Sequence, residues 1–229
     1  MFLGIGLAPI VHAEEAPASP TPAATTAATA AVKQDPAETM KAAYLDMKNG
    51  QADAALAKVN GLIEADAQNK EAHLLRAMIY AAQEQWDKAS SEYDAVLAFD
   101  PNDTVVKFDE TELKFMQKKY DEARPGFLAI ENDKAMGDFA TYKVFLCDLF
   151  AGHDDVAAKD LDVINQVGEN PSYYFANAAW DLAHNKTEEA ADWLRSAERI
   201  YSNAPAKCFR YAASLKDHGY LPLHLSSAQ

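Results

Sequence analysis

The pattern of apolar, small and polar residues repeats about every 34 residues over most of the chain, a spacing typical of repeat arrays. Apolar side chains follow four and seven residues after each small residue, as in Val59 and Leu62 after Ala55. These spacings place them on one face of an α-helix, so each unit contains an amphipathic helix. The small residues that mark the register are Ala55, Ala89, Ala123, Ala157 and Ala190.

A turn is predicted five residues before each of these alanines. Glycine or asparagine occupies three of the five places, and both residues favour the backbone conformation that ends a helix. A second amphipathic segment precedes each turn, for example residues 70–83, so each unit is predicted to be helix, tight turn, helix. The five turn positions are Gly50, Glu84, Lys118, Gly152 and Asn185.

This arrangement resembles the tetratricopeptide repeat family, with about five repeats over residues 36–203. The resemblance implies an all-α fold: a right-handed solenoid of antiparallel helix pairs, followed by a C-terminal capping helix over residues 204–220. Such a cap must be more polar on one face than the repeats that it covers. The second unit carries the fullest match, at Ala77, Tyr80, Trp86, Ala89, Tyr93, Leu97 and Pro101.

The third unit departs from the family pattern. Pro125 and Gly126 lie inside its second helix, which predicts a kink or a late helix start. The following segment, residues 131–138, lacks the usual terminal proline, so we expect an irregular link to the fourth unit. The position that is usually tryptophan in the family is filled by Thr39, His73, Lys107, Thr141 and Tyr174.

The ends of the chain have different compositions from the repeats. Residues 1–13 are apolar and end in a small-x-small pattern, which predicts a truncated signal-peptide-like leader without a basic n-region, and hence export to a bacterial periplasm. Residues 14–35 are rich in Ala, Pro and Thr and are expected to form a flexible tether. Residues 221–229 are expected to be loose or to lie back on the array.

The net charge of −14 argues against binding to nucleic acid or to anionic lipid, because both need a basic surface. The repeats contain no apolar run long enough to cross a bilayer, so no membrane insertion of the mature chain is expected. In the second unit, we interpret Trp86, Tyr93 and Phe99 as the packing face. Its charged residues are interpreted as a solvated face, and they are Glu84, Asp87, Lys88 and Glu92.

No pattern of catalytic or metal-ligating residues is present in the sequence. The six histidines do not cluster, and neither of the two cysteines, Cys147 and Cys208, lies in a CxxC motif. The two thiols are expected to lie about two repeats apart, too far for a disulfide within the chain, although Cys208 could pair between chains. We interpret the segment Gly152–Asp155 as the end of one helix at Gly152 and the start of the next at Asp154 or Asp155, and not as a metal site. We therefore predict no catalytic residue, no metal, no cofactor and no enzyme activity.

The resemblance implies a groove lined by the first helix of every unit. Its places here are apolar and rich in Met and aromatic residues, which suits an apolar helix or extended segment of a partner protein. Alternatively, single side chains of this face pack helix against helix, or the tether or the tail fills the groove. The alternative functions are that the array self-associates as a homo-oligomer or that it assists envelope assembly. The predicted partner-binding residues are Met40, Tyr44, Met47, Leu74, Met78, Phe108, Glu112, Phe115, Phe139, Tyr142, Leu146 and Phe175.

Overall fold

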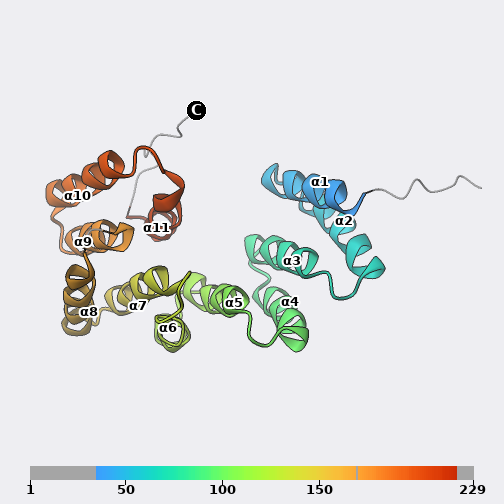
Figure 1. Ribbon diagram of the computed structural model, residues 1–229, viewed down its shortest axis with the longest axis horizontal. Helices are drawn as coiled ribbons and strands as arrows, with labels where there is room; N and C mark the ends of the chain where they lie inside the picture. The colour runs from blue at the N-terminus through green and yellow to red at the C-terminus, as the bar shows by residue number, and fades with distance from the viewer. Residues whose placement is uncertain (1–34, 169, 221–229) are drawn as a thin grey trace, which may run out of the picture. The chain divides into compact units, whose positions relative to one another are not determined.

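A computed structural model describes residues 35–168 and 170–220. In this part of the chain all regular structure is α-helical, with eleven helices (Figure 1). The predicted leader, the tether up to residue 34, and the tail lie outside the described residues. The unit that begins at Asp35 is described by itself below.

Ten of the helices form five consecutive pairs. Each helix from α1 to α9 packs against the next one along the chain, and α1 also contacts α3 as α7 contacts α9. The predicted all-α array of helix pairs is thus confirmed. The pairs are α1 (Pro36–Lys48) with α2 (Ala52–Ala65), α3 (Lys70–Ala82) with α4 (Trp86–Phe99), α5 (Thr104–Met116) with α6 (Tyr120–Leu128), α7 (Gly137–Ala151) with α8 (Asp154–Val167), and α9 (Pro171–Ala183) with α10 (Thr187–Ile200).

The helix predicted after the fifth unit is also present, as α11 (Ala206–Asp217). It packs against α9, the first helix of the fifth repeat, and lies beside it in Figure 1. The sequence predicted this helix but not the surface that it covers.

All five predicted turn residues have a left-handed backbone. Their φ angles are 75° at Gly50, 56° at Glu84, 60° at Lys118, 79° at Gly152 and 61° at Asn185. Glycine adopts this conformation without steric cost, whereas Glu84 and Lys118 adopt it against the preference of residues with a Cβ atom. The turn geometry therefore follows the repeat register even where the residue type does not favour it.

The first helices of four repeats begin with an Asp or Asn cap. The side chain of Asp35 accepts a hydrogen bond from the Ala37 amide at 2.9 Å, and Asn69, Asp103 and Asn170 accept similar bonds at 3.0 Å. Each such cap contributes about 1 kcal/mol to helix stability. The fourth repeat, whose first helix begins at Gly137, has no side-chain cap.

The third repeat is irregular, as predicted, but in a different way. Helix α6 starts in register at Tyr120 and ends after nine residues, with Pro125 in its interior. Gly126 lies so close to α5 that a Cβ atom there would be 2.4 Å from Thr111 Oγ1. The helix is therefore shortened at its end rather than delayed at its start, and residues 129–136 link it to α7.

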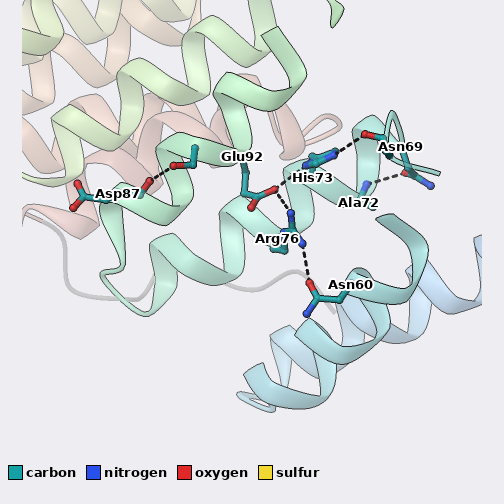
Figure 2. A network of polar contacts seen from close by, with 9 residues as sticks. Asn60, Asn69, Ala72, His73, Arg76, Asp87 and Glu92 are labelled. Carbon is teal, nitrogen blue, oxygen red and sulfur yellow. Dashed lines mark hydrogen bonds and ion pairs between the residues drawn. The ribbon is translucent and has the colours of Figure 1, made fainter. Parts of the chain in front are cut away.

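One prediction about the second repeat is wrong, because Glu92 is buried and not solvated. Its Oε2 accepts hydrogen bonds from Arg76 Nη2 at 2.8 Å and contacts His73 Nδ1 at 2.7 Å (Figure 2). Arg76 also donates to Asn60 Oδ1 at 2.8 Å, which joins α3 to the first repeat. This network offsets the cost of burying the carboxylate. Glu84, Asp87 and Lys88 are exposed as predicted.

The hydrophobic core is divided along the array. One cluster belongs to the first repeat and the start of the second, and another joins the second repeat to α5. The largest cluster runs through repeats three to five and includes Tyr211 and Leu215 of α11. The last helix is therefore part of the C-terminal core and not an appendage to it.

Candidate protein-interaction groove

An apolar strip is open to solvent on the first helices of repeats one and two. We call Met40, Tyr44, Leu74 and Met78 the open strip. Together with Ala37, Lys41, Glu71 and Leu75 they line a shallow groove of about 470 Å³ between α1 and α3. Tyr44 is 44% exposed and Met78 is 46% exposed, so the strip offers large apolar side chains to solvent. Met47, also predicted to bind a partner, packs half-buried against the core of the first repeat.

The groove residues predicted in repeats three to five lie in the core. The structure leaves them at most 6% exposed, so a partner cannot reach them while the surrounding helices stay in place. They are Phe108, Phe115, Phe139, Tyr142, Leu146 and Phe175. The register of the repeats identified these positions as apolar, but it gave no sign of what covers them.

The N-terminal half of α11 covers several of these residues. The Tyr211 ring lies 4.9 Å from Phe139, 5.1 Å from Tyr142 and 5.8 Å from Phe175, measured between ring centroids. Tyr142 Oη donates a hydrogen bond to the Tyr211 carbonyl oxygen at 3.3 Å, and Tyr211 Oη donates to Asp138. Tyr211 is thus held between α7 and α9 by both stacking and hydrogen bonds.

The C-terminal end of α11 reaches α5. The ring of His218 lies 4.7 Å from Phe115 and stacks on Phe150 at 4.5 Å, while Tyr220 stacks on Phe150 at 5.3 Å. Burial lowers the pKa of His218, which favours the neutral ring in this aromatic setting. Helix α11 therefore crosses from α9 over α7 to α5, along the face that the first helices form.

Lys143 is a fully buried cation beneath α11. Its Nζ donates to Glu112 Oε1 at 2.7 Å and to Ser214 Oγ at 3.3 Å, and it lies 3.4 Å from the Phe115 ring centroid. Burial lowers the pKa of Lys143, and the ion pair with Glu112 opposes this shift. The predicted groove residue Glu112 thus balances a buried charge, and its Oε2 is buried without a hydrogen-bond partner among the described residues.

Asp109 lies beside Glu112 on α5. Burial, followed by the nearby Glu112 carboxylate, raises the pKa of Asp109 to about 6. Sequence reasoning named neither Asp109 nor Lys143. A signal was available in the register, since the two residues hold the same place in successive repeats and carry opposite charges.

A further group of charged residues lies on α6, α7 and α8. Arg124 Nε donates to Asp148 Oδ2 at 2.6 Å, and burial, followed by a hydrogen bond with Asp148, raises the pKa of Asp160 to about 7. Arg124, Asp148 and Asp160 thus form an ion-pair network that joins the three helices. Across residues 35–168 and 170–220, three or more metal-ligating side chains nowhere come together. Both cysteines have free thiols.

Comparison with protein families supports the repeat assignment. Residues 46–107 match the family model of the tetratricopeptide repeat. The predicted resemblance is confirmed, and the helix pairs are tetratricopeptide-like repeats. Comparison with curated protein sequences gives no match.

Several solved structures share the fold at low sequence identity. A tetratricopeptide repeat protein from Parabacteroides merdae is 19% identical over 80% of this chain and 70% of that chain, with a TM-score of 0.61. A thermophilic tetratricopeptide repeat protein from Thermus thermophilus is 16% identical over 80% of this chain and all of that chain (100%), with a TM-score of 0.57. MamA from Desulfovibrio magneticus RS-1 is 14% identical over 74% and 96% of the two chains, with a TM-score of 0.53. At these identities the likeness shows the fold alone.

The fold supports a role as a protein-interaction scaffold. Within the described residues, no helix combines the length and the apolar character needed to cross a bilayer.

Proposed function

We propose that the protein is a non-enzymatic scaffold that binds an apolar helix or peptide of another protein at the open strip. The observation that carries this proposal is the exposure of Tyr44 and Met78 on adjacent first helices, at the edge of an apolar groove. A continuous exposed apolar surface of this kind commonly marks an interface. Methionine and tyrosine side chains suit such a role because they adapt their packing or supply a large amphipathic contact.

The filled part of the groove supports the same proposal. Over repeats three to five, α11 shows that the first-helix face accepts an amphipathic helix. Repeats one and two present the same repeat positions without a helix over them among the described residues. A partner helix would complete there what α11 completes in the C-terminal repeats.

The experiment is site-specific photo-crosslinking in the native host. A photoreactive amino acid replaces Met78 in the open strip or, as the matched control, Val163, which is 52% exposed on α8. We expect a discrete crosslinked protein from position 78 and none of the same mass from position 163. In a second step, Tyr44→Asp should abolish the crosslink from position 78. Identical crosslinks from both positions would contradict the assignment of the strip.

Sedimentation of the purified chain separates partner binding from self-association. A crosslinked product with twice the mass of the chain, together with a dimer in sedimentation, would favour the self-associating array. A monomer with a crosslinked product of another mass would favour a partner protein.

We also propose that the protein acts in the bacterial cell envelope. The apolar run at residues 1–13 supports this proposal, and it lies outside the described residues. Fractionation of the host and N-terminal sequencing of the native protein test it. Recovery from the periplasm with an N-terminus near Glu14 is expected, whereas an intact leader in the cytosol would refute export.

A further inference from the structure

The contact between α11 and the C-terminal repeats shows which positions of the first helices meet a bound helix. In the fourth repeat these include Phe139, Lys143 and Phe150. They touch Tyr211 and Ser214 of α11 and His218, which follows the helix directly. Most of the contact is aromatic. Lys143 supplies a polar contact to the helix through the Ser214 hydroxyl.

The third repeat has a carboxylate where the fourth repeat has this lysine. Asp109 lies 34 residues before Lys143 (143 − 109) and therefore holds the same place on α5 that Lys143 holds on α7. The described residues provide no ion-pair partner for Asp109 within 4.0 Å, whereas Glu112 is paired through Oε1 to Lys143. Burial makes the Asp109 carboxylate costly to ionise, and a nearby cation would remove that cost.

Exposed apolar side chains flank Asp109 on the same face of α5. Val105, four residues before it, is 46% exposed, and Met116, seven residues after it, is 43% exposed. These spacings place the three residues on one helical stripe. Val105 and Asp109 hold the repeat positions of Glu71 and Leu75, which line the groove between α1 and α3, so this stripe lies on the same first-helix face as the open strip.

We propose that the open strip and Asp109 together bind an amphipathic helix of another protein that carries a Lys or Arg at the end lying over α5. The apolar face of that helix covers Tyr44, Met78 and Val105, and its cation pairs with Asp109. This inference rests on the proposed function and specifies the chemistry of the partner.

The spacing of the helices sets the length of the partner segment. Packed helix axes lie about 8–10 Å apart, and the first helices of neighbouring repeats touch less than the two helices of one repeat do. A helix that spans α1, α3 and α5 therefore crosses at least about 16–20 Å. At about 1.5 Å per residue this is roughly 12 residues, or three turns. The cation therefore lies about three turns from the end of the helix that contacts α1.

The test uses the full chain and three stapled, fluorescein-labelled helical peptides of about 14 residues, a length that covers this span. Each peptide has one leucine stripe and differs only at the terminal position, which is Lys, Gln or Glu. Fluorescence anisotropy measures binding at 0.15 M salt, since charge pairs weaken as salt rises. We expect the Lys peptide to bind roughly tenfold more tightly than the Gln peptide, as a partly buried charged hydrogen bond can provide.

The protein variants locate this preference. Asp109→Asn should abolish the preference for Lys, so that the Lys and Gln peptides bind with equal affinity. Asp94→Asn, which removes an exposed carboxylate from α4, is the matched control and should leave the preference intact. A preference for Lys that survives Asp109→Asn would overturn the inference.

The remaining outcomes separate this inference from the proposed function. If all three peptides bind equally and Tyr44→Asp abolishes binding, the chemistry assigned to the partner is wrong and the open strip stands. If no peptide binds in a strip-dependent manner, both proposals fall. A peptide of residues 204–220 is measured in the same assay. Tighter binding of that peptide than of the Lys peptide would identify a second copy of this chain as the occupant and overturn the inference.

Discussion

The first two repeats and the last three differ in the solvent exposure of equivalent positions on their first helices. Tyr44 and Met78 are 44% and 46% exposed, whereas Leu146, at the equivalent position of the fourth repeat, is 0% exposed. The difference does not lie in the first helices themselves, which have 13 to 15 residues in all five repeats. It arises because α11 covers α7 and α9 and reaches α5. An apolar repeat position is therefore a core position only where another element covers it.

The two regions also differ in the charge that the face carries. Beneath α11, the cation Lys143 is fully buried and paired with Glu112. One repeat earlier, Asp109 carries the opposite charge and lies next to exposed apolar residues. In the region covered by α11, the buried cation is thus paired with a carboxylate. In the neighbouring region that α11 leaves uncovered, Asp109 remains available to pair with a cation of a partner.

The largest expected effect comes from removing the main anchor of α11. Tyr211 is 2% exposed and packs on three aromatic rings, so Tyr211→Ala should lower the free energy of unfolding by about 3–5 kcal/mol. Equilibrium urea unfolding followed by circular dichroism measures this loss. Phe209→Ala on the same helix is the control, because Phe209 is 75% exposed and should change the free energy by less than about 0.5 kcal/mol. Equal losses of unfolding free energy in the two variants would contradict the role of Tyr211 as the anchor of α11.

The next effect concerns the buried charge. Glu112→Gln leaves Lys143 in the core without a carboxylate, which should cost about 2–3 kcal/mol of unfolding free energy, since Glu112 itself is partly exposed. Thermal and urea unfolding measure the loss. Adding Lys143→Met to this variant should recover most of it, because an apolar side chain suits the same site. A Glu112→Gln variant as stable as the wild type would show that the ion pair between Lys143 and Glu112 does not stabilise the repeats beneath α11.

Replacing the acidic group of the open region should stabilise the chain. The pKa of Asp109 is raised to about 6, so the folded chain holds its proton more tightly than the unfolded chain. Between about pH 4 and pH 6 the stability contributed by this group therefore falls as the pH rises. Asp109→Asn should gain about 1–3 kcal/mol at pH 7 and little below pH 4.

Unfolding curves of the wild type and of Asp109→Asn at several pH values measure this gain. Asp94→Asn again serves as the control, with no gain expected at any pH. A gain that is the same at pH 3.5 and pH 7 would exclude ionisation of Asp109 as its cause.

The smallest expected effect lies in the open strip. Met78→Ala removes a side chain that is already 46% exposed, so the free energy of unfolding should change by no more than about 0.5 kcal/mol. Leu146→Ala, at the equivalent place under α11, should cost about 2–5 kcal/mol. Calorimetry or urea unfolding of the two variants compares the regions directly. A loss at Met78 as large as that at Leu146 would mean that the strip is covered in solution.

Local features of the fold could be predicted from the sequence. The period of small and apolar residues identified the helix pairs, because helical amphipathicity depends on residues three and four apart. The register also located all five left-handed turn residues, including Glu84 and Lys118, whose side chains do not favour that conformation. The Asp and Asn caps of the first helices recur in the same register but were not recognised in advance.

The candidate site could be predicted only in part. The first-helix positions were found from the register, and four of them form the open strip in repeats one and two. The burial of Phe139, Tyr142 and Phe175 could not be predicted, because it depends on α11, which lies between 31 and 78 residues further along the chain (206 − 175 and 217 − 139). The burial of Glu92 likewise depends on His73 and Arg76 from the preceding helix.

The helix pairs, their turns and the apolar character of the first-helix face follow from the amino-acid sequence alone. These depend on spacings within one repeat, which are short-range properties of the chain. Contacts between distant segments of the chain, by contrast, determine which part of that face is exposed to solvent. They also determine that Lys143 pairs with Glu112 and that Asp109 has no ion-pair partner among the described residues. The physical reason is that burial and electrostatic pairing depend on which elements meet in space, and α11 could have packed at the end of the array instead of across its first helices.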